Sequence, residues 1–74
     1  MDGLTEGRIV HYVPSGGFNS HRAAVVTHIW SQATGCVNLH VFPDGSYGIP
    51  NTEPTSILYD EAGAPGTWHW IEKA

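Results

Sequence analysis

The sequence predicts an all-β fold: a small, strongly bent five-stranded sheet or SH3-like barrel that is oligomeric. Short runs rich in β-branched and aromatic residues alternate with turn residues along the 74 positions, a pattern typical of antiparallel β proteins. No capped helical period is visible, apart from a possible single turn near Asp60 and Glu61. The length suits one domain, so we expect residues 1–74 to form a single β domain in which 1–6 are flexible.

Five runs have strand character, and they cover residues 8–13, 23–30, 36–42, 56–59 and 67–71. The second run is apolar on both faces at its start, which predicts a central strand that is covered on both sides. The breaks between the runs are rich in glycine and proline, which supply positive φ angles or remove ladder donors. These breaks fall at 14–17, 33–35, 43–45, 48–54 and 63–66.

The third and fifth runs show a period of two, so their alternate residues should lie on opposite faces of the sheet. In the fifth run, Trp68 and Trp70 share one face and His69 lies on the other. In the third run, three apolar residues should face the core and three residues should face away from it. The predicted core residues are Val37, Leu39 and Val41, and those of the other face are Asn38, His40 and Phe42.

Charge and composition exclude several classes of partner. The net charge is −4, with three basic and seven acidic residues, and this disfavours binding to a nucleic acid polymer. A small anion remains possible, because one well-placed arginine can hold a phosphate. There is no visible signal peptide and no apolar run long enough for a membrane. Together with the single cysteine, Cys36, this predicts a cytoplasmic protein without membrane partners.

The small size predicts self-association. A core of this size seldom contributes more than about 3–5 kcal/mol, and one cysteine cannot form an intrachain disulfide. A partner subunit or a metal ion is then the candidate source of further stability. We expect a homo-oligomer, because symmetric contacts would bury the surplus of aromatic side chains.

Three short segments hold the candidate ligand-binding residues. Each also has a purely structural interpretation. The two tryptophans could stack on a nucleobase, or they could anchor the core or a subunit interface. On the first strand, Tyr12 could stack on a base and His11 could donate to a phosphate, or the tyrosine could pack at the core margin. In the third segment, His21 and Arg22, the arginine could clamp a phosphate or be a solvated charge. The candidates are His11, Tyr12, His21, Arg22, Trp68, His69 and Trp70.

Neither a metal site nor a catalytic set is predicted. The five histidines lack the close spacing of a zinc motif, and Cys36 has no CxxC partner, although ligands could still converge from separate strands. Cys36 could form a nucleophile set with a histidine and a carboxylate such as Asp44, Asp60 or Glu61. A packing cysteine is the ordinary case, and no P-loop, GxGxxG or nucleophile elbow is present. We therefore expect no cofactor and no enzyme activity.

Five segments in a fixed order form a pattern over most of the chain. They are Gly7-Arg-Ile-Val-His-Tyr-Val13, His21-Arg-Ala-Ala-Val-Val26 with Trp30, Val37-Asn-Leu-His-Val-Phe42 with Asp44-Gly45, Leu58-Tyr-Asp-Glu61 and Pro65-Gly-Thr-Trp-His-Trp70. This order resembles a large group of short phage and prophage proteins, whose pattern runs G-x-I-V-H-Y-V, H-R-P-A, V-N-L-x-V-F and P-G-T-W-H-W. The likeness extends over 7–70, with Ala23 in place of a proline.

This group is similar to the phage sponge proteins that counter CBASS and, in some members, Thoeris defence. The resemblance implies an oligomer that sequesters a signalling nucleotide, of the cyclic dinucleotide or cyclic ADP-ribose type, without cleaving it. It also implies a location in the cytoplasm of an infected bacterial host. Because the chain has only one arginine next to a histidine, we expect ligand pockets between subunits, where two copies double that supply. Two alternatives stay open: a protein-interaction module with an aromatic surface and, less favoured, a small metal- or cysteine-dependent enzyme.

Overall fold

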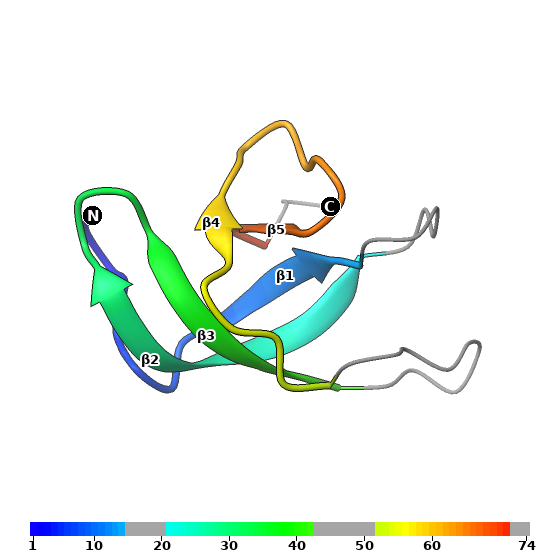
Figure 1. Ribbon diagram of the computed structural model, residues 1–74, viewed down its shortest axis with the longest axis horizontal. Helices are drawn as coiled ribbons and strands as arrows, with labels where there is room; N and C mark the ends of the chain where they lie inside the picture. The colour runs from blue at the N-terminus through cyan, green and yellow to red at the C-terminus, as the bar shows by residue number, and fades with distance from the viewer. Residues whose placement is uncertain (15–20, 43–51, 72–74) are drawn as a thin grey trace.

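The fold is a single curled sheet of five strands, in the order β3-β2-β1-β5-β4. The structure, a computed structural model, describes residues 1–14, 21–42 and 52–71. The strands are β1 (Ile9–Val13), β2 (Arg22–Ser31), β3 (Cys36–Val41), β4 (Leu58–Tyr59) and β5 (Thr67–His69). All neighbours are antiparallel except β4 and β5, which are parallel. The sheet curls into a half-barrel (Figure 1), which confirms the predicted all-β class.

The predicted strands are found, and their ends differ by one to two residues. β2 is longer than expected, β4 keeps only two residues, and β5 ends at His69. The predicted breaks at 33–35 and 63–66 lie in turns, and no helix occurs at Asp60 and Glu61. The breaks predicted at 15–17, 43–45 and 48–51 fall outside the described residues. The described part of the chain has no helix long and apolar enough to cross a membrane.

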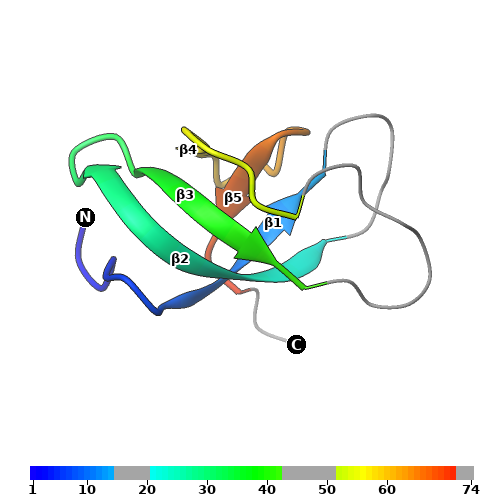
Figure 2. The same ribbon diagram turned by 60° about the horizontal axis from the view of Figure 1, so that its bottom comes forward.

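Two irregularities bend the long hairpin of β2 and β3. The register shifts between Val26 and His28 and again between Ile29 and Ser31. Each such bulge leaves an unpaired residue on one strand and increases the local twist. Figure 2 shows β2 curving in an arc beneath β3, and the first part of β2 pairs with β1.

One face of the sheet holds the core, and we call it the core face. Its side chains alternate along each strand with those of the opposite side, the outer face. Val37, Leu39 and Val41 are buried as predicted, and Phe42 is exposed. On β2, Ala24 is buried but Ala23 is exposed. The expectation that β2 starts covered on both sides is therefore wrong, because no described segment covers its outer face there. The core comprises Leu4, Val10, Tyr12, Ala24, Val26, Val37, Leu39, Val41 and Trp68.

Within residues 1–6, for which the sequence predicts flexibility, Leu4 packs into the core and the other five residues are exposed. Leu4 is 2% exposed and belongs to the core. Its carbonyl accepts a hydrogen bond from Gln32 Nε2 at 2.8 Å, and the amino group of Met1 donates to the Gln32 carbonyl at 3.2 Å. Apolar contact and hydrogen bonds together place this segment beside the turn that joins β2 to β3.

Candidate functional site

The seven predicted site residues separate into two groups on opposite sides of the sheet. Tyr12 pairs with Arg22 on one side and with Trp68 on the other, so these three form a row across β2, β1 and β5. The row lies on the core face, where Tyr12 is 7% exposed, Arg22 is 1% exposed and Trp68 is 0% exposed. Residues one position away point to the outer face. The strand register therefore determines which predicted residues can meet a ligand on the surface.

Trp68 is a core anchor in this structure. Its Nε1 donates to the Gly35 carbonyl at 2.7 Å, a buried hydrogen bond that ties β5 to the turn before β3. Its ring meets those of Tyr59 and Trp70 edge to face, both at 5.0 Å between centroids. The ring has no open surface on which a nucleobase could stack. Trp68 therefore lies where a core anchor would lie. The ring of Tyr12 is also buried, at the position of a packing residue.

Gly35 makes this arrangement possible. It has a φ of 71°, and a Cβ at this position would lie 2.9 Å from Tyr59 Cβ and 3.3 Å from Trp68 Cζ2. A positive φ and a close approach of this kind both require glycine. The turn can thus reach the indole of Trp68 only because this residue has no side chain.

Trp70 lies against a cationic side chain, and Arg22 is buried. Trp70 is half-buried, and the Arg8 guanidinium lies 5.3 Å from its ring centroid, a cation–π geometry. Arg22, proposed either as a phosphate clamp or as a solvated charge, is 1% exposed. As the structure stands, its guanidinium is not open to a phosphate arriving from solvent.

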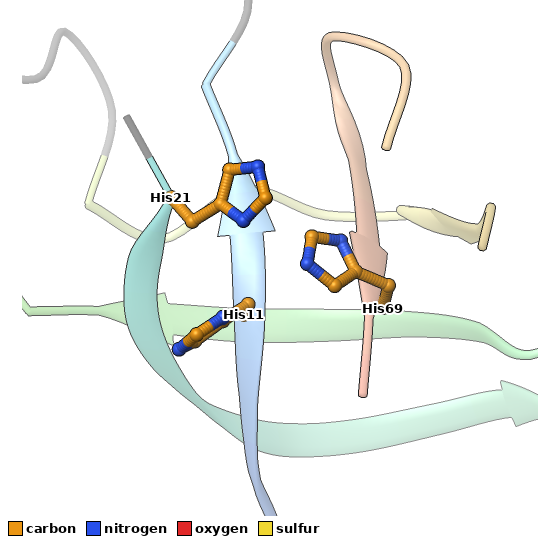
Figure 3. Close-up of side chains that lie close together, drawn as sticks. All are labelled: His11, His21 and His69. Carbon is orange, nitrogen blue, oxygen red and sulfur yellow. The ribbon is translucent and has the colours of Figure 1, made fainter. Parts of the chain in front are cut away.

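The other three predicted residues, His11, His21 and His69, come together on the outer face, and we call them the histidine cluster. His11 pairs directly with His69 across β1 and β5. His21 immediately precedes Arg22, a core-face residue, and so points the opposite way. Figure 3 shows the three imidazoles gathered over β1, with those of His21 and His69 brought in from either side. One ligand atom from each ring lies within 4.8 Å of the others.

The rings touch edge to face and differ in exposure. The centroid distance is 4.5 Å between His21 and His69, and His11 is 5.8 Å and 5.7 Å from them. His69 is 5% exposed, His11 is half-buried and His21 is exposed. The cluster is therefore closed on the side of β5 and open on the side of His21.

The turn before β5 accounts for the burial of His69. The Asp60 carboxylate accepts hydrogen bonds from the amides of Ala62 at 2.9 Å and Ala64 at 3.3 Å, which folds residues 60–64 into a compact turn. Gly63, with a φ of 77°, lies at its tip, and a Cβ there would be 3.9 Å from His69 Nδ1. This turn forms one wall of the cluster.

Imidazoles grouped in this way can do two kinds of chemistry. Neutral imidazole nitrogens are the commonest protein ligands for transition metals, and imidazole N–H groups donate to anionic oxygens. Cys36 is remote from the cluster, because it pairs with Ser31 at the far end of β2. The nucleophile set of Cys36 with a histidine of this cluster is therefore not assembled.

Sequence reasoning named all three residues but did not predict that they meet. Their positions, 11, 21 and 69, have none of the short spacings by which zinc motifs are found. The usable signal is alternation: His11 and His69 each lie beside a large aromatic residue that belongs in the core. That signal becomes a site only when β1 is known to pair with β5.

Comparisons with known proteins add no family to this description. No protein-family model, no curated protein and no solved structure matches the chain.

Proposed function

We propose that the protein is a non-catalytic binding protein that sequesters a signalling nucleotide of antiphage defence, of the cyclic dinucleotide or cyclic ADP-ribose type. It would act in the cytoplasm of an infected bacterial host and block the defence response by lowering the free concentration of the signal. The resemblance to phage sponge proteins motivates the choice of ligand. The histidine cluster is our candidate place of contact.

The observation that carries this proposal is the convergence of His11 on β1, His21 just before β2 and His69 on β5 at the outer face. Each imidazole can donate a hydrogen bond to a phosphate oxygen. His11 and His69 are direct partners in the sheet. Their backbone positions are therefore fixed before binding, which lowers the conformational entropy lost when a ligand binds. A net charge of −4 suits a small ligand with few phosphates better than a polyanion.

Base stacking in this proposal moves from the buried aromatics to the outer face. The Phe42 amide donates to the Ala23 carbonyl at 2.9 Å, and Ala23 pairs with His11. Phe42, 43% exposed, therefore continues the row that contains His11 and His69, with only the small Ala23 between. A purine or pyrimidine lying over Ala23 would meet an aromatic ring on one side and imidazole donors on the other.

Self-association is the second part of the proposal. Large apolar side chains remain on the surface, including Ile9 at 43%, Leu58 at 52% and Ile71 at 51% exposure. Contact between copies would cover them and would place ligand pockets between subunits. We expect light scattering to give a mass that is a multiple of 8.0 kDa. A monomer at micromolar concentration would remove this part of the proposal.

The deciding experiment is incubation of the full chain, without an affinity tag, with a panel of cyclic dinucleotides and cyclic ADP-ribose isomers. Binding is measured by calorimetry, and the ligand is then released by heat and identified by chromatography. Intact ligand supports sequestration, and a cleaved ligand would establish an enzyme instead. His21→Ala should weaken binding at least about tenfold, as loss of a charge-assisted hydrogen bond predicts. His28→Ala, on an exposed histidine outside the cluster, is the matched control.

A second candidate function is a protein-interaction module. The observation in its favour is Trp30, which is 60% exposed. Its Nε1 donates to Asn38 Oδ1 at 2.8 Å, and its ring packs on His28 at 4.3 Å. A tryptophan fixed in this way on the surface is typical of a binding hot spot. Failure of every nucleotide to bind, with the protein folded, would favour this alternative.

A further inference from the structure

We propose that His11, His21 and His69 form a binding site for a transition metal ion of the zinc class, with three nitrogen ligands and an open fourth position. This inference stands apart from the nucleotide proposal, because it depends only on the geometry and chemistry of the three side chains. Spacing along the sequence does not suggest it.

The first support is distance. The three ligand nitrogens lie within 4.8 Å of one another. Two nitrogens bound tetrahedrally to one zinc ion at ~2.0–2.1 Å are about 3.4 Å apart. Small rotations about the side-chain torsions would be enough to close that difference. The imidazoles of His21 and His69, at 4.5 Å between centroids, already lean toward each other over β1 (Figure 3).

The second support is the way the backbone holds the ligands. His11 and His69 are direct partners in an antiparallel pair, which fixes their Cβ atoms roughly 4.5–5.5 Å apart. His21 immediately precedes β2, the strand on the other side of β1. The turn at Gly63 passes close to the His69 ring, because a Cβ at Gly63 would lie 3.9 Å from His69 Nδ1. Two ligands from paired strands and a third from the residue before β2 lie close together before any metal binds, which lowers the entropy lost on binding.

The chemistry of the ligands indicates the class of metal. Imidazole suits zinc, cobalt, nickel and copper, whereas magnesium and calcium prefer oxygen ligands. Three neutral ligands leave the full charge of the ion in place. The fourth position is then free for water or for an anionic oxygen, the arrangement of open zinc sites. His21, the exposed member, lies on the side from which such a group would enter.

A metal would also answer the need for stability in a chain of this size. With one cysteine, Cys36, which is free, the chain has no intrachain disulfide. Joining β1, β5 and the start of β2 through one ion would cross-link the middle of the sheet. Because the unfolded chain does not hold the three ligands together, metal binding would raise the melting temperature in a concentration-dependent way.

The competing explanation is that the three imidazoles pack edge to face as a small aromatic cluster and bind nothing. Such contacts are common in structures without metals. This explanation predicts that the histidines contribute to packing alone, with no specific affinity for any ion. The two explanations differ in a measurement made without nucleotide, so failure of the metal proposal and failure of the nucleotide proposal are distinguishable.

The test uses the full untagged chain, freed of metal by a chelator, and titrates it with Zn²⁺ by calorimetry and with Co²⁺ by visible absorption. We expect one ion per chain and, with Co²⁺, the intense visible bands of four-coordinate cobalt. His21→Ala is the primary variant, because its exposed side chain can be removed with the fold intact. It should weaken zinc binding by at least about tenfold, since even outer-shell substitutions cost 10–100-fold.

Controls and contrary outcomes are equally specific. His28→Ala and His40→Ala remove histidines outside the cluster and should bind zinc as the unaltered chain does. His69→Gln tests the buried ligand, with circular dichroism as the check on folding. The proposal is overturned if the unaltered chain binds no zinc, or if His21→Ala binds it unchanged. Equal weakening by the His28 and His40 variants, which would mark scattered surface binding, overturns it as well.

Discussion

The two faces of β1 and β5 carry aromatic side chains in equal measure and use them differently. On the core face, Tyr12 and Trp68 are buried and pair across the two strands. One residue away on each strand, His11 and His69 form an equally direct pair on the outer face. The first pair is part of the core, and the second belongs to the histidine cluster, for which we propose binding of a metal ion or a phosphate group. Neighbouring residues on each of these strands thus lie in different surroundings. Substitutions on one face should therefore leave the other face unaltered.

The largest effect on stability is expected from Trp68→Ala. It empties a fully buried site and removes the hydrogen bond to the Gly35 carbonyl, and truncation of a buried tryptophan costs about 3–5 kcal/mol. For a domain this small, such a loss should abolish the folded state in denaturant titrations followed by fluorescence. Trp30→Ala, on a 60% exposed side chain, is the control and should cost far less. Equal effects of the two variants would contradict the assignment of Trp68 to the core.

Gly35→Ala should follow in size. The added Cβ would lie 2.9 Å from Tyr59 Cβ at a residue with a φ of 71°, and strain of this kind costs on the order of 1–3 kcal/mol. The free energy of unfolding should fall accordingly. Gly7→Ala is the comparison, because its φ is similarly positive but nothing lies within 4 Å of its Cβ. If both variants lost the same amount, backbone conformation alone and not the contact with β4 would explain the glycine.

Alkaline pH should act on the core face through Tyr12. Burial raises the pKa of Tyr12 above its ordinary value of 10.0, because the interior disfavours the charged phenolate. The resulting contribution to stability is fully present below the unfolded pKa and is lost as pH rises through the folded pKa. The melting temperature should therefore fall as pH rises above about 10.

Tyr12→Phe isolates this contribution. It keeps the ring and removes the ionising group, so its melting temperature should fall less steeply over the same alkaline range. Tyr59→Phe, which leaves Tyr12 in place, is the matched control. A Tyr12→Phe variant with an unchanged alkaline profile would assign the loss to other groups.

The smallest effect on stability is expected from His21→Ala in the absence of metal. The side chain is exposed, and substitutions at such positions usually change stability by within about 0.5 kcal/mol. Unfolding by denaturant with a chelator present should show no more than this. A loss comparable to that of Gly35→Ala would mean that the histidine cluster is a packing feature and would erase the distinction between the two faces.

Alternation within strands was predictable from the sequence, and pairing between distant strands was not. The inward positions of Val37, Leu39 and Val41 follow from a period of two, and the structure confirms them. The same period separates His69 from Trp68. However, in a short strand such as β1, alternation does not indicate which face of the strand is buried. It also does not say that β1 lies between β2 and β5.

Arg22 shows the same limit. A basic residue beside a histidine after a glycine-containing stretch suggests an exposed clamp, and yet its side chain is 1% exposed. Its position follows from register, because it pairs with Tyr12 and therefore shares the core face. Local chemistry does not predict the burial of this side chain, because long-range pairing determines the face on which it lies.

The pairing of β1 with β5 has a consequence for how the molecule folds. The β2–β3 hairpin joins neighbours in sequence, whereas His11 and His69 meet only after most of the chain has been brought round to close a long loop. Contacts of such separation have a high entropic cost and slow the folding reaction. A partly folded chain that holds only the hairpin would keep Trp30 and Asn38 together but would have no histidine cluster. A ligand of that cluster would therefore select the fully folded chain and slow its unfolding.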